Sequence, residues 1–128
     1  MKVYGSGLSA PNGELVPLSL AVEEGELLFF SGQLALKKGI IQGDIEEQTT
    51  LIFDTLEIKL AELALTLDNV VKATIWLTNP SDFSRFNAVY RKRMSEPFPA
   101  RSCVVSSLVL PGALIEIEIV ASRAHRRA

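Results

Sequence analysis

Hydrophobic and polar positions alternate along residues 97–121, the pattern of β-strands whose successive side chains point to opposite faces of a sheet. Arg101 and Cys103 share one face of the first stretch. In the second stretch isoleucines alternate with Glu116 and a further glutamate. Leu110-Pro111-Gly112 interrupts the pattern with turn residues. We therefore predict two C-terminal strands joined as a hairpin.

A period near 3.6 residues predicts two helices. The longer one covers residues 45–65, where apolar side chains recur at helical spacing. Asp44 stands before it as an N-cap, and Glu47 is placed to complete a capping box. A second amphipathic helix is predicted over residues 83–94, after a turn and cap at residues 79–82.

Three further segments are predicted as strands. Residues 15–22 suit a short edge strand, because Pro17 cannot donate to a ladder, and Glu23-Glu24-Gly25 would form the following turn. Leu27 to Ser31 is apolar on both faces, which predicts a strand covered on both sides. Residues 70–77 are β-branched and alternating. One face of that last strand is expected to carry Val71, Ala73, Ile75 and Leu77.

The order strands, helix, strand, helix, strand, strand predicts one α+β domain over residues 1–128, with a mixed sheet and both helices on one face. Two helices cover only one side of such a sheet. Large apolar residues such as Leu27, Phe29 and Trp76, or their neighbours, would then face water in a monomer. An apolar face of that size predicts self-association.

Composition narrows the class of protein. Hydrophobic residues make up 48% and charged residues 22% of the 128, values typical of a globular domain. The net charge of −2 gives no field that would attract nucleic acid, and no apolar run approaches the roughly 20 residues of a membrane span.

A single cysteine fits a reducing compartment, so we expect a cytoplasmic protein. A basic cluster read as a solvated tail comprises Arg123, His125, Arg126 and Arg127.

Few residues of this chain can do chemistry. His125 is the only histidine and lies in the tail, which leaves no two-histidine ribonuclease mechanism, no Ser-His-Asp triad and no histidine–cysteine metal cluster. Arg101 is suited to a bidentate grip on a small carboxylate, or else to an ion pair with Glu116 or Glu118. Glu116 is either a base for proton transfer or the solvent face of its strand.

Three other positions leave alternatives open. Asn87 falls where the second helix should be apolar, so it is either a satisfied buried amide or a pocket residue. Ser31 and Gly32 end an apolar strand, and Gly32 would let a ligand approach the backbone. Cys103 is interpreted as a small buried hydrophobe rather than a nucleophile, since no base partner is evident.

Several segments together resemble one family. Pro99-Ala100-Arg101-Ser102, followed by apolar residues and Ile115-Glu116-Ile117, is similar to the signature of the Rid/YjgF family. Those proteins are reactive-intermediate imine deaminases, also described as L-PSP endoribonucleases or translation initiation inhibitors. The resemblance covers residues 10–122, including Phe-Ser-Gly-Gln at 30–33. It implies a homotrimer of chorismate-mutase-like domains whose sheets close a central barrel, with sites in the clefts between subunits.

The resemblance also implies roles for single residues. Arg101 matches the arginine that binds the carboxylate of an imino or enamino acid, and Glu116 matches the glutamate that activates the hydrolytic water. The matching substrate-binding positions are Ser31, Gly32, Asn87 and Cys103, with the glycine and the cysteine acting through their backbone.

One position departs from the family pattern. Where the deaminases carry an aromatic residue that lines the site from the adjoining subunit, this chain has Leu18. Leucine offers neither a hydroxyl donor nor a ring face, which affects substrate choice and, to a lesser degree, turnover.

The resemblance implies hydrolytic deamination of 2-imino or 2-enamino acids to 2-oxo acids and ammonia. Arg101 would orient the carboxylate and Glu116 would position the water. No metal or organic cofactor is required, because a protonated imine is already electrophilic. One alternative is a trimer that binds small carboxylates without turnover, as a sensor or scaffold. A ribonuclease or translation-inhibitor role is disfavoured by the acidic charge and the missing histidines, so we expect neither nucleic acid nor membrane as a partner.

Overall fold

The computed structural model describes residues 1–124 and shows one mixed sheet with two α-helices. The sheet is 7-stranded in the order β1-β2-β3-β7-β5-β6, and β4 also pairs with β7. All neighbouring strands are antiparallel except β5 and β6, which are parallel. The elements are β1 (Lys2–Tyr4), β2 (Ala21–Glu24), β3 (Leu27–Phe30), β4 (Gln33–Leu34), α1 (Ile45–Glu62), the 3-10 helix η1 (Leu67–Asn69), β5 (Val70–Leu77), the 3-10 helix η2 (Pro80–Asp82), α2 (Phe83–Arg93), β6 (Ala100–Val105) and β7 (Ile115–Ser122).

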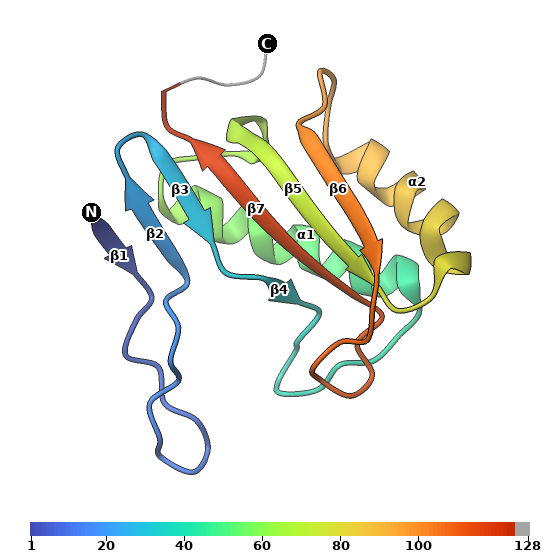
Figure 1. The fold of residues 1–128 in the computed structure, drawn as a ribbon, viewed down its shortest axis with the longest axis horizontal. Helices are drawn as coiled ribbons and strands as arrows, with labels where there is room; N and C mark the ends of the chain where they lie inside the picture. The colour runs from blue at the N-terminus through green and yellow to red at the C-terminus, as the bar shows by residue number, and fades with distance from the viewer. Residues whose placement is uncertain (125–128) are drawn as a thin grey trace.

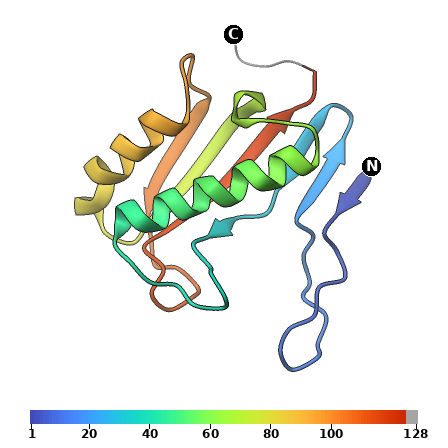
Figure 2. The same ribbon diagram turned by 180° about the vertical axis from the view of Figure 1, so that it is seen from behind.

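Both helices lie on the same face of the sheet, behind it in Figure 1 and in front of it in Figure 2. This confirms the predicted α+β architecture. The core fills the space between the two layers: Phe53 and Leu56 of α1 and Phe86 of α2 are fully buried, as are Ile75 of β5 and Ile117 of β7. Among the described residues no helix is long and apolar enough to cross a membrane.

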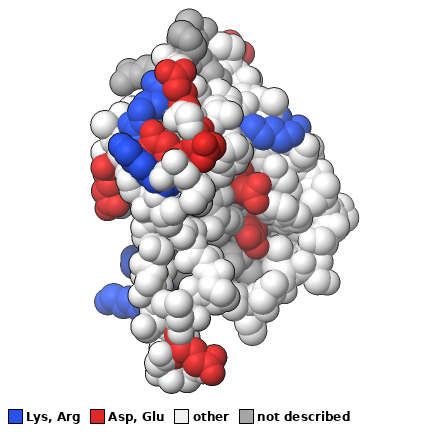
Figure 3. Space-filling model, turned by 60° about the vertical axis from the view of Figure 1, so that its left-hand side comes forward, with Lys and Arg blue, Asp and Glu red and all other residues white. Residues whose placement is uncertain are grey.

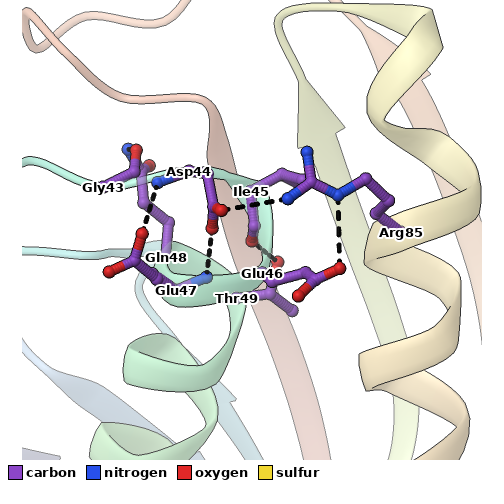
Figure 4. A network of polar contacts seen from close by, with 8 residues as sticks. All are labelled: Gly43, Asp44, Ile45, Glu46, Glu47, Gln48, Thr49 and Arg85. Atoms are coloured by element: carbon purple, nitrogen blue, oxygen red, sulfur yellow. Dashed lines mark hydrogen bonds and ion pairs between the residues drawn. The ribbon is translucent and has the colours of Figure 1, made fainter.

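The start of α1 follows the capping signals of the sequence. The Asp44 side chain accepts from the Glu47 N–H at 2.9 Å, and the Glu47 side chain accepts from the Asp44 N–H at 3.1 Å. Arg85 of α2 donates to Asp44 and to Glu46, which ties the two helices together (Figure 4).

The end of α1 comes earlier than predicted, at Glu62 rather than residue 65. Ala64 takes the left-handed conformation with φ 61°. The Ala64 N–H bonds the Ala61 carbonyl, and the Leu65 N–H bonds the Leu60 carbonyl. This Schellman pattern terminates the helix, although no glycine marks the position.

The N-terminal strand prediction was wrong in position. Residues 15–20 are not a strand, because the Leu18 N–H turns back to the Val16 carbonyl at 2.8 Å. The strand begins at Ala21 instead and includes Glu23, which was expected in the turn. Strand β1 was not predicted at all.

The predicted strand at residues 70–77 is present, but a bulge near Val70 buries that residue and leaves Val71 37% exposed.

The predicted C-terminal hairpin is absent. Strands β6 and β7 are not neighbours, because β5 lies between them and pairs with both. The chain passes around the end of β5 through residues 106–114. Buried Gln48 fixes the end of this connection: its amide donates to the carbonyls of Gly43 and Gly112, and its Oε1 accepts from the Leu114 N–H at 2.9 Å.

The face of the sheet opposite the helices is open in a single chain. Leu27 is 40% and Phe29 47% exposed, so β3 is covered on one side only and not on both as predicted. Their exposure agrees with the predicted apolar face. In Figure 3 much of the visible surface is uncharged, acidic side chains lie in a hollow, and charges of both signs gather at one end.

The start of the basic C-terminal cluster is not a solvated tail. The Arg123 side chain donates to Glu23 at 2.9 Å and to the Leu63 carbonyl at 2.8 Å. Its backbone N–H bonds the Glu26 carbonyl. The remaining members of the cluster, His125, Arg126 and Arg127, lie outside the described residues.

Candidate functional site

Arg101 lies on the helix side of the sheet, at the edge strand β6. It is in register with the buried Ala73 of β5, so its side chain emerges on the face that α2 covers. Arg101 Nη1 donates to Asn87 Oδ1 at 2.7 Å. The guanidinium carbon lies 4.9 Å from the Tyr90 ring centroid. Together these contacts hold the guanidinium in one orientation.

A cleft of about 280 Å³ opens beside this guanidinium. Its wall comes from α2 and from the segment that leads into β6, and it consists of Asn87, Tyr90, Arg91, Phe98, Pro99 and Arg101. That wall holds no carboxylate. Within residues 1–124, Arg101 also forms no ion pair with an aspartate or glutamate.

Cys103 follows Arg101 on the same side of β6 and is half-buried. Burial raises the pKa of the Cys103 thiol, and Arg101 offsets part of the rise. A thiol held in its protonated form is a poor nucleophile, which agrees with its interpretation as a small hydrophobe. The Ser106 N–H bonds the Leu77 carbonyl of β5. Because N–H directions alternate along a strand, the Cys103 N–H points to the outer edge.

Glu116 lies on the opposite face of the sheet from Arg101. It is in register with Trp76 of β5, whereas its neighbours Ile115 and Ile117 point into the core. The two ion-pair partners considered for Arg101, Glu116 and Glu118, are therefore separated from it by the sheet itself. The alternative of an ion pair between Arg101 and either glutamate is therefore wrong within one chain.

The Glu116 carboxylate rests against the backbone of Gly32. A Cβ added at Gly32 would overlap the Glu116 Oε2 atom, so only glycine leaves room for this contact. Burial, and then the neighbouring Glu118 carboxylate, raise the pKa of Glu116. A carboxyl group with a raised pKa is better matched to proton transfer near neutral pH than an ordinary one.

Ser31 anchors the N-terminal loop next to Gly32 and Glu116. Its hydroxyl donates to the Ser19 carbonyl at 2.6 Å, and its N–H bonds the Leu20 carbonyl at 2.9 Å. Leu18 precedes this anchored segment and is 49% exposed. The Ser31 hydroxyl proton is thus used to hold the loop, and Leu18 offers an apolar side chain to the surroundings.

The candidate residues form two groups in a single chain. We call Asn87, Arg101 and Cys103 the arginine half-site, and Leu18, Ser31, Gly32 and Glu116 the glutamate half-site. The two lie on opposite faces of the sheet. Arg91, Phe98 and the supporting role of Tyr90 were missed by sequence reasoning. The sequence did carry a signal for Arg91, because it stands four residues after Asn87 and so lies on the same helix face.

No group of three or more His, Cys, Asp or Glu side chains within residues 1–124 is placed to hold a metal ion. The chemistry available to the two half-sites is that of a guanidinium, a carboxyl group and backbone amides. This set can bind a small anion and move protons.

The chain is similar to known proteins over most of its length. A family model described as endoribonuclease L-PSP matches residues 9–123. The mitochondrial protein mmf2 of Schizosaccharomyces pombe is 39% identical over 110 residues, which cover 83% of this chain and 87% of that protein. The structure of RidA from an Antarctic Psychrobacter aligns with a TM-score of 0.81 at 27% identity, over 95% of this chain and 98% of that one. E. coli TdcF with bound serine aligns with a TM-score of 0.82 at 26% identity, over 97% and 100%.

Proposed function

We propose a function from one premise: the chain belongs to the endoribonuclease L-PSP family, also called the Rid/YjgF family. The proposed reaction is the hydrolysis of short 2-imino acids, such as 2-iminopropanoate, to 2-oxo acids and ammonia. One observation carries the proposal. The Arg101 guanidinium is held by Asn87 and Tyr90 beside a cleft without carboxylates, and it is not neutralised by an ion pair within residues 1–124.

Arg101 is the group that would bind the substrate carboxylate. A guanidinium presents a planar fork of donors that matches a carboxylate with two parallel hydrogen bonds. Asn87 accepts from Nη1 and leaves the other donors of the fork for the ligand. The Cys103 N–H at the outer edge of β6 is a further donor close to the same strand position.

Glu116 is the group that would handle the water. As a carboxylate it takes a proton from water while the oxygen forms a bond to the imine carbon, and the electron pair of the C=N double bond moves to nitrogen. For a protonated imine this gives a neutral carbinolamine, and Glu116 donates the proton to its nitrogen. The C–N bond then breaks to release ammonia while the hydroxyl loses its proton to Glu116 and the C=O bond forms. Passing this last proton to the ammonia releases ammonium and restores the carboxylate. Atoms and charge balance without an oxidant, a reductant or a metal.

The two half-sites meet only between two copies of the chain. Arg101 and Glu116 face opposite sides of one sheet, so a molecule as small as 2-iminopropanoate could not touch both in a monomer. The exposed apolar face at Leu27 and Phe29 supports self-association. We therefore place the active site between subunits of a homotrimer, with Arg101 from one and Glu116 from its neighbour.

Serine bound to E. coli TdcF supports the class of ligand. Serine carries the carboxylate, the α-carbon and the nitrogen that a 2-imino acid also presents. A relative of the same fold that holds such a molecule favours a small amino-acid-like ligand for this chain.

The deciding experiment uses a coupled assay. An amino-acid oxidase generates imino acids, and semicarbazide traps what the protein leaves unhydrolysed. Wild type is expected to lower the trapped product, and Arg101→Ala and Glu116→Gln are each expected to fail. If the site lies between subunits, refolding the two variants together at equal amounts should restore about a quarter of the wild-type activity, because each mixed trimer then contains one intact site. A mixture as inactive as its components would place both groups in one subunit or exclude one of them.

Leu18 favours one alternative, a trimer that binds small carboxylates without turnover. It is the residue at which this chain departs from the aromatic of the family, and it is half exposed on the loop that Ser31 anchors. Binding of 2-oxobutanoate by a wild-type protein that hydrolyses no imino acid would decide for this alternative. A gain of hydrolysis in Leu18→Tyr would then identify the missing ring and hydroxyl as the cause.

An RNA-directed role is not part of the proposal. The net charge is −2, and the only histidine, His125, lies outside the described residues. Any RNA binding is expected to fall steeply with salt and to disappear when residues 125–128 are deleted.

The cytoplasmic location stays a prediction, because a relative as similar as mmf2 is described as mitochondrial.

A further inference from the structure

The cleft beside Arg101 contains a second guanidinium. Arg91 lines the same wall, which also includes Phe98 and holds no aspartate or glutamate. Arg91 lies four residues after Asn87 on α2, and residues at this spacing are neighbours about 5–6 Å apart on one helix face. Asn87 in turn contacts Arg101 directly. The two cations therefore border one small space.

The basic residues at the end of α2 differ in their partners. Arg93 donates to Asp54 at 2.8 Å and to Glu57 at 3.1 Å, so its charge is neutralised by α1. Arg91 forms no ion pair within the part of the chain that the structure describes. Lys92, between them, does not line the cleft. Arg91 is thus the cation of this helix end that faces the cleft without a carboxylate beside it.

A second cation next to the carboxylate-binding arginine repels it unless an anion lies between them or beside them. A substrate with one carboxylate would satisfy Arg101 alone. A substrate with a second carboxylate at the end of its side chain would satisfy both guanidinium groups, while its methylene groups lie along the exposed Phe98 ring.

We propose that Arg91 is a specificity-determining residue and that the cleft favours dicarboxylic 2-imino acids. Arg101 binds the carboxylate next to the imine carbon, and Arg91 binds the distal carboxylate. This inference rests on the proposed function, since it names the substrate class of the same site. The reaction is unchanged: one water is added, and one ammonia leaves, with the distal carboxylate retained.

The test compares two substrates of equal chain length that differ in one charged group. Glutamate oxidation supplies 2-iminoglutarate, and norvaline oxidation supplies 2-iminopentanoate. The ratio of their kcat/KM values is measured for wild type, Arg91→Gln and Lys92→Gln in the semicarbazide assay. Lys92→Gln removes the same charge from the next residue of the helix but leaves the cleft wall unaltered.

Wild type is expected to prefer 2-iminoglutarate, and Arg91→Gln is expected to lower the kcat/KM ratio about five-fold, the size of an ion pair at a partly exposed position. Arg91→Glu should lower it further, because the introduced carboxylate repels the substrate. Lys92→Gln should leave the ratio as it is. Equal ratios in wild type and Arg91→Gln, or equal shifts in Arg91→Gln and Lys92→Gln, would overturn the inference.

A binding measurement separates this inference from the proposed function. Isothermal titration compares 2-oxoglutarate with 2-oxopentanoate on the same three proteins, and it needs no turnover. If no imino acid is hydrolysed but 2-oxoglutarate binds more tightly in an Arg91-dependent way, the proposed function fails and the specificity stands. If 2-iminoglutarate and 2-iminopentanoate are hydrolysed equally well, the specificity fails and the proposed function stands. If neither hydrolysis nor binding is seen, both are wrong.

Discussion

The arginine half-site and the glutamate half-site differ in how many of their contacts and walls a single chain supplies. Arg101 is fixed by a hydrogen bond to Asn87 and by the Tyr90 ring, and it borders a defined cleft. Glu116 rests against the backbone of Gly32 on a face that is open in a single chain. The first half-site has an oriented cation and a cleft wall within one chain, whereas the second lies on a face that nothing covers in a single chain. Under the proposed function, one chain would therefore supply carboxylate binding, and catalysis would require assembly.

The largest expected effect is on the glutamate half-site. Glu116→Gln keeps the shape of the side chain but removes the proton acceptor, so kcat should fall about 10³-fold while KM changes little. Steady-state kinetics on 2-iminopropanoate checks this. A loss that appeared mainly in KM would mean that Glu116 binds substrate and would break the contrast between the two half-sites.

The next effect is on the arginine half-site. Arg101→Ala removes the charged fork that binds the carboxylate, and kcat/KM should fall about a hundred-fold, mostly through KM. Arg85→Ala is a matched control, because it deletes an arginine whose ion pairs with Asp44 and Glu46 lie away from the cleft. It should stay within about two-fold of wild type, as expected for exposed pairs. Full activity in Arg101→Ala would exclude its assigned role.

A smaller effect is expected where the glutamate half-site depends on backbone space. In Gly32→Ala the new Cβ must displace the Glu116 carboxylate, and a misplaced base should lower kcat about ten-fold. The same substitution in a Glu116→Gln background should have little additional effect, because the group that it displaces has already been inactivated. Additive losses in this double-mutant cycle would show that Gly32 acts independently of Glu116.

The smallest effect concerns pH. Glu118 is the second cause of the raised pKa of Glu116, after burial. Because Glu116 must be ionised to accept a proton, kcat/KM falls as pH drops through its pKa. Glu118→Gln removes the repulsion and lowers this pKa, so the acid limb of the pH profile should move to lower pH, with the plateau unchanged. An unmoved limb, or one that moved upward, would mean that another group controls it.

Local signals in the sequence predicted the elements with local hydrogen bonding. The Asp44 cap, the Asn79 turn and both amphipathic helices were found where expected, because capping and i,i+4 packing depend on residues close in the chain. The end of α1 was predicted too late in the chain. Ala64 adopts the left-handed conformation that ends the helix, and an alanine gives no sequence signal for it, whereas a glycine would.

Strand neighbours were predicted less well. An alternating pattern states which residues share a face of one strand, but it does not state which strand lies alongside. The hairpin prediction therefore failed when β5 entered between β6 and β7, although the face assignments of Arg101 and Glu116 were correct in themselves. Arg91 was overlooked for a related reason: its position in the cleft depends on how α2 packs against the segment before β6.

The sequence by itself determined the α+β class, the family and the two side chains to which chemistry is assigned. These follow from local periodicity and from short motifs, which are properties of neighbouring residues. Only the tertiary structure decided that Arg101 and Glu116 face opposite sides of the sheet and that Arg91 joins Arg101 at one cleft. Such relations arise from long-range strand pairing and helix packing, and their energetics depend on residues that are distant in the chain.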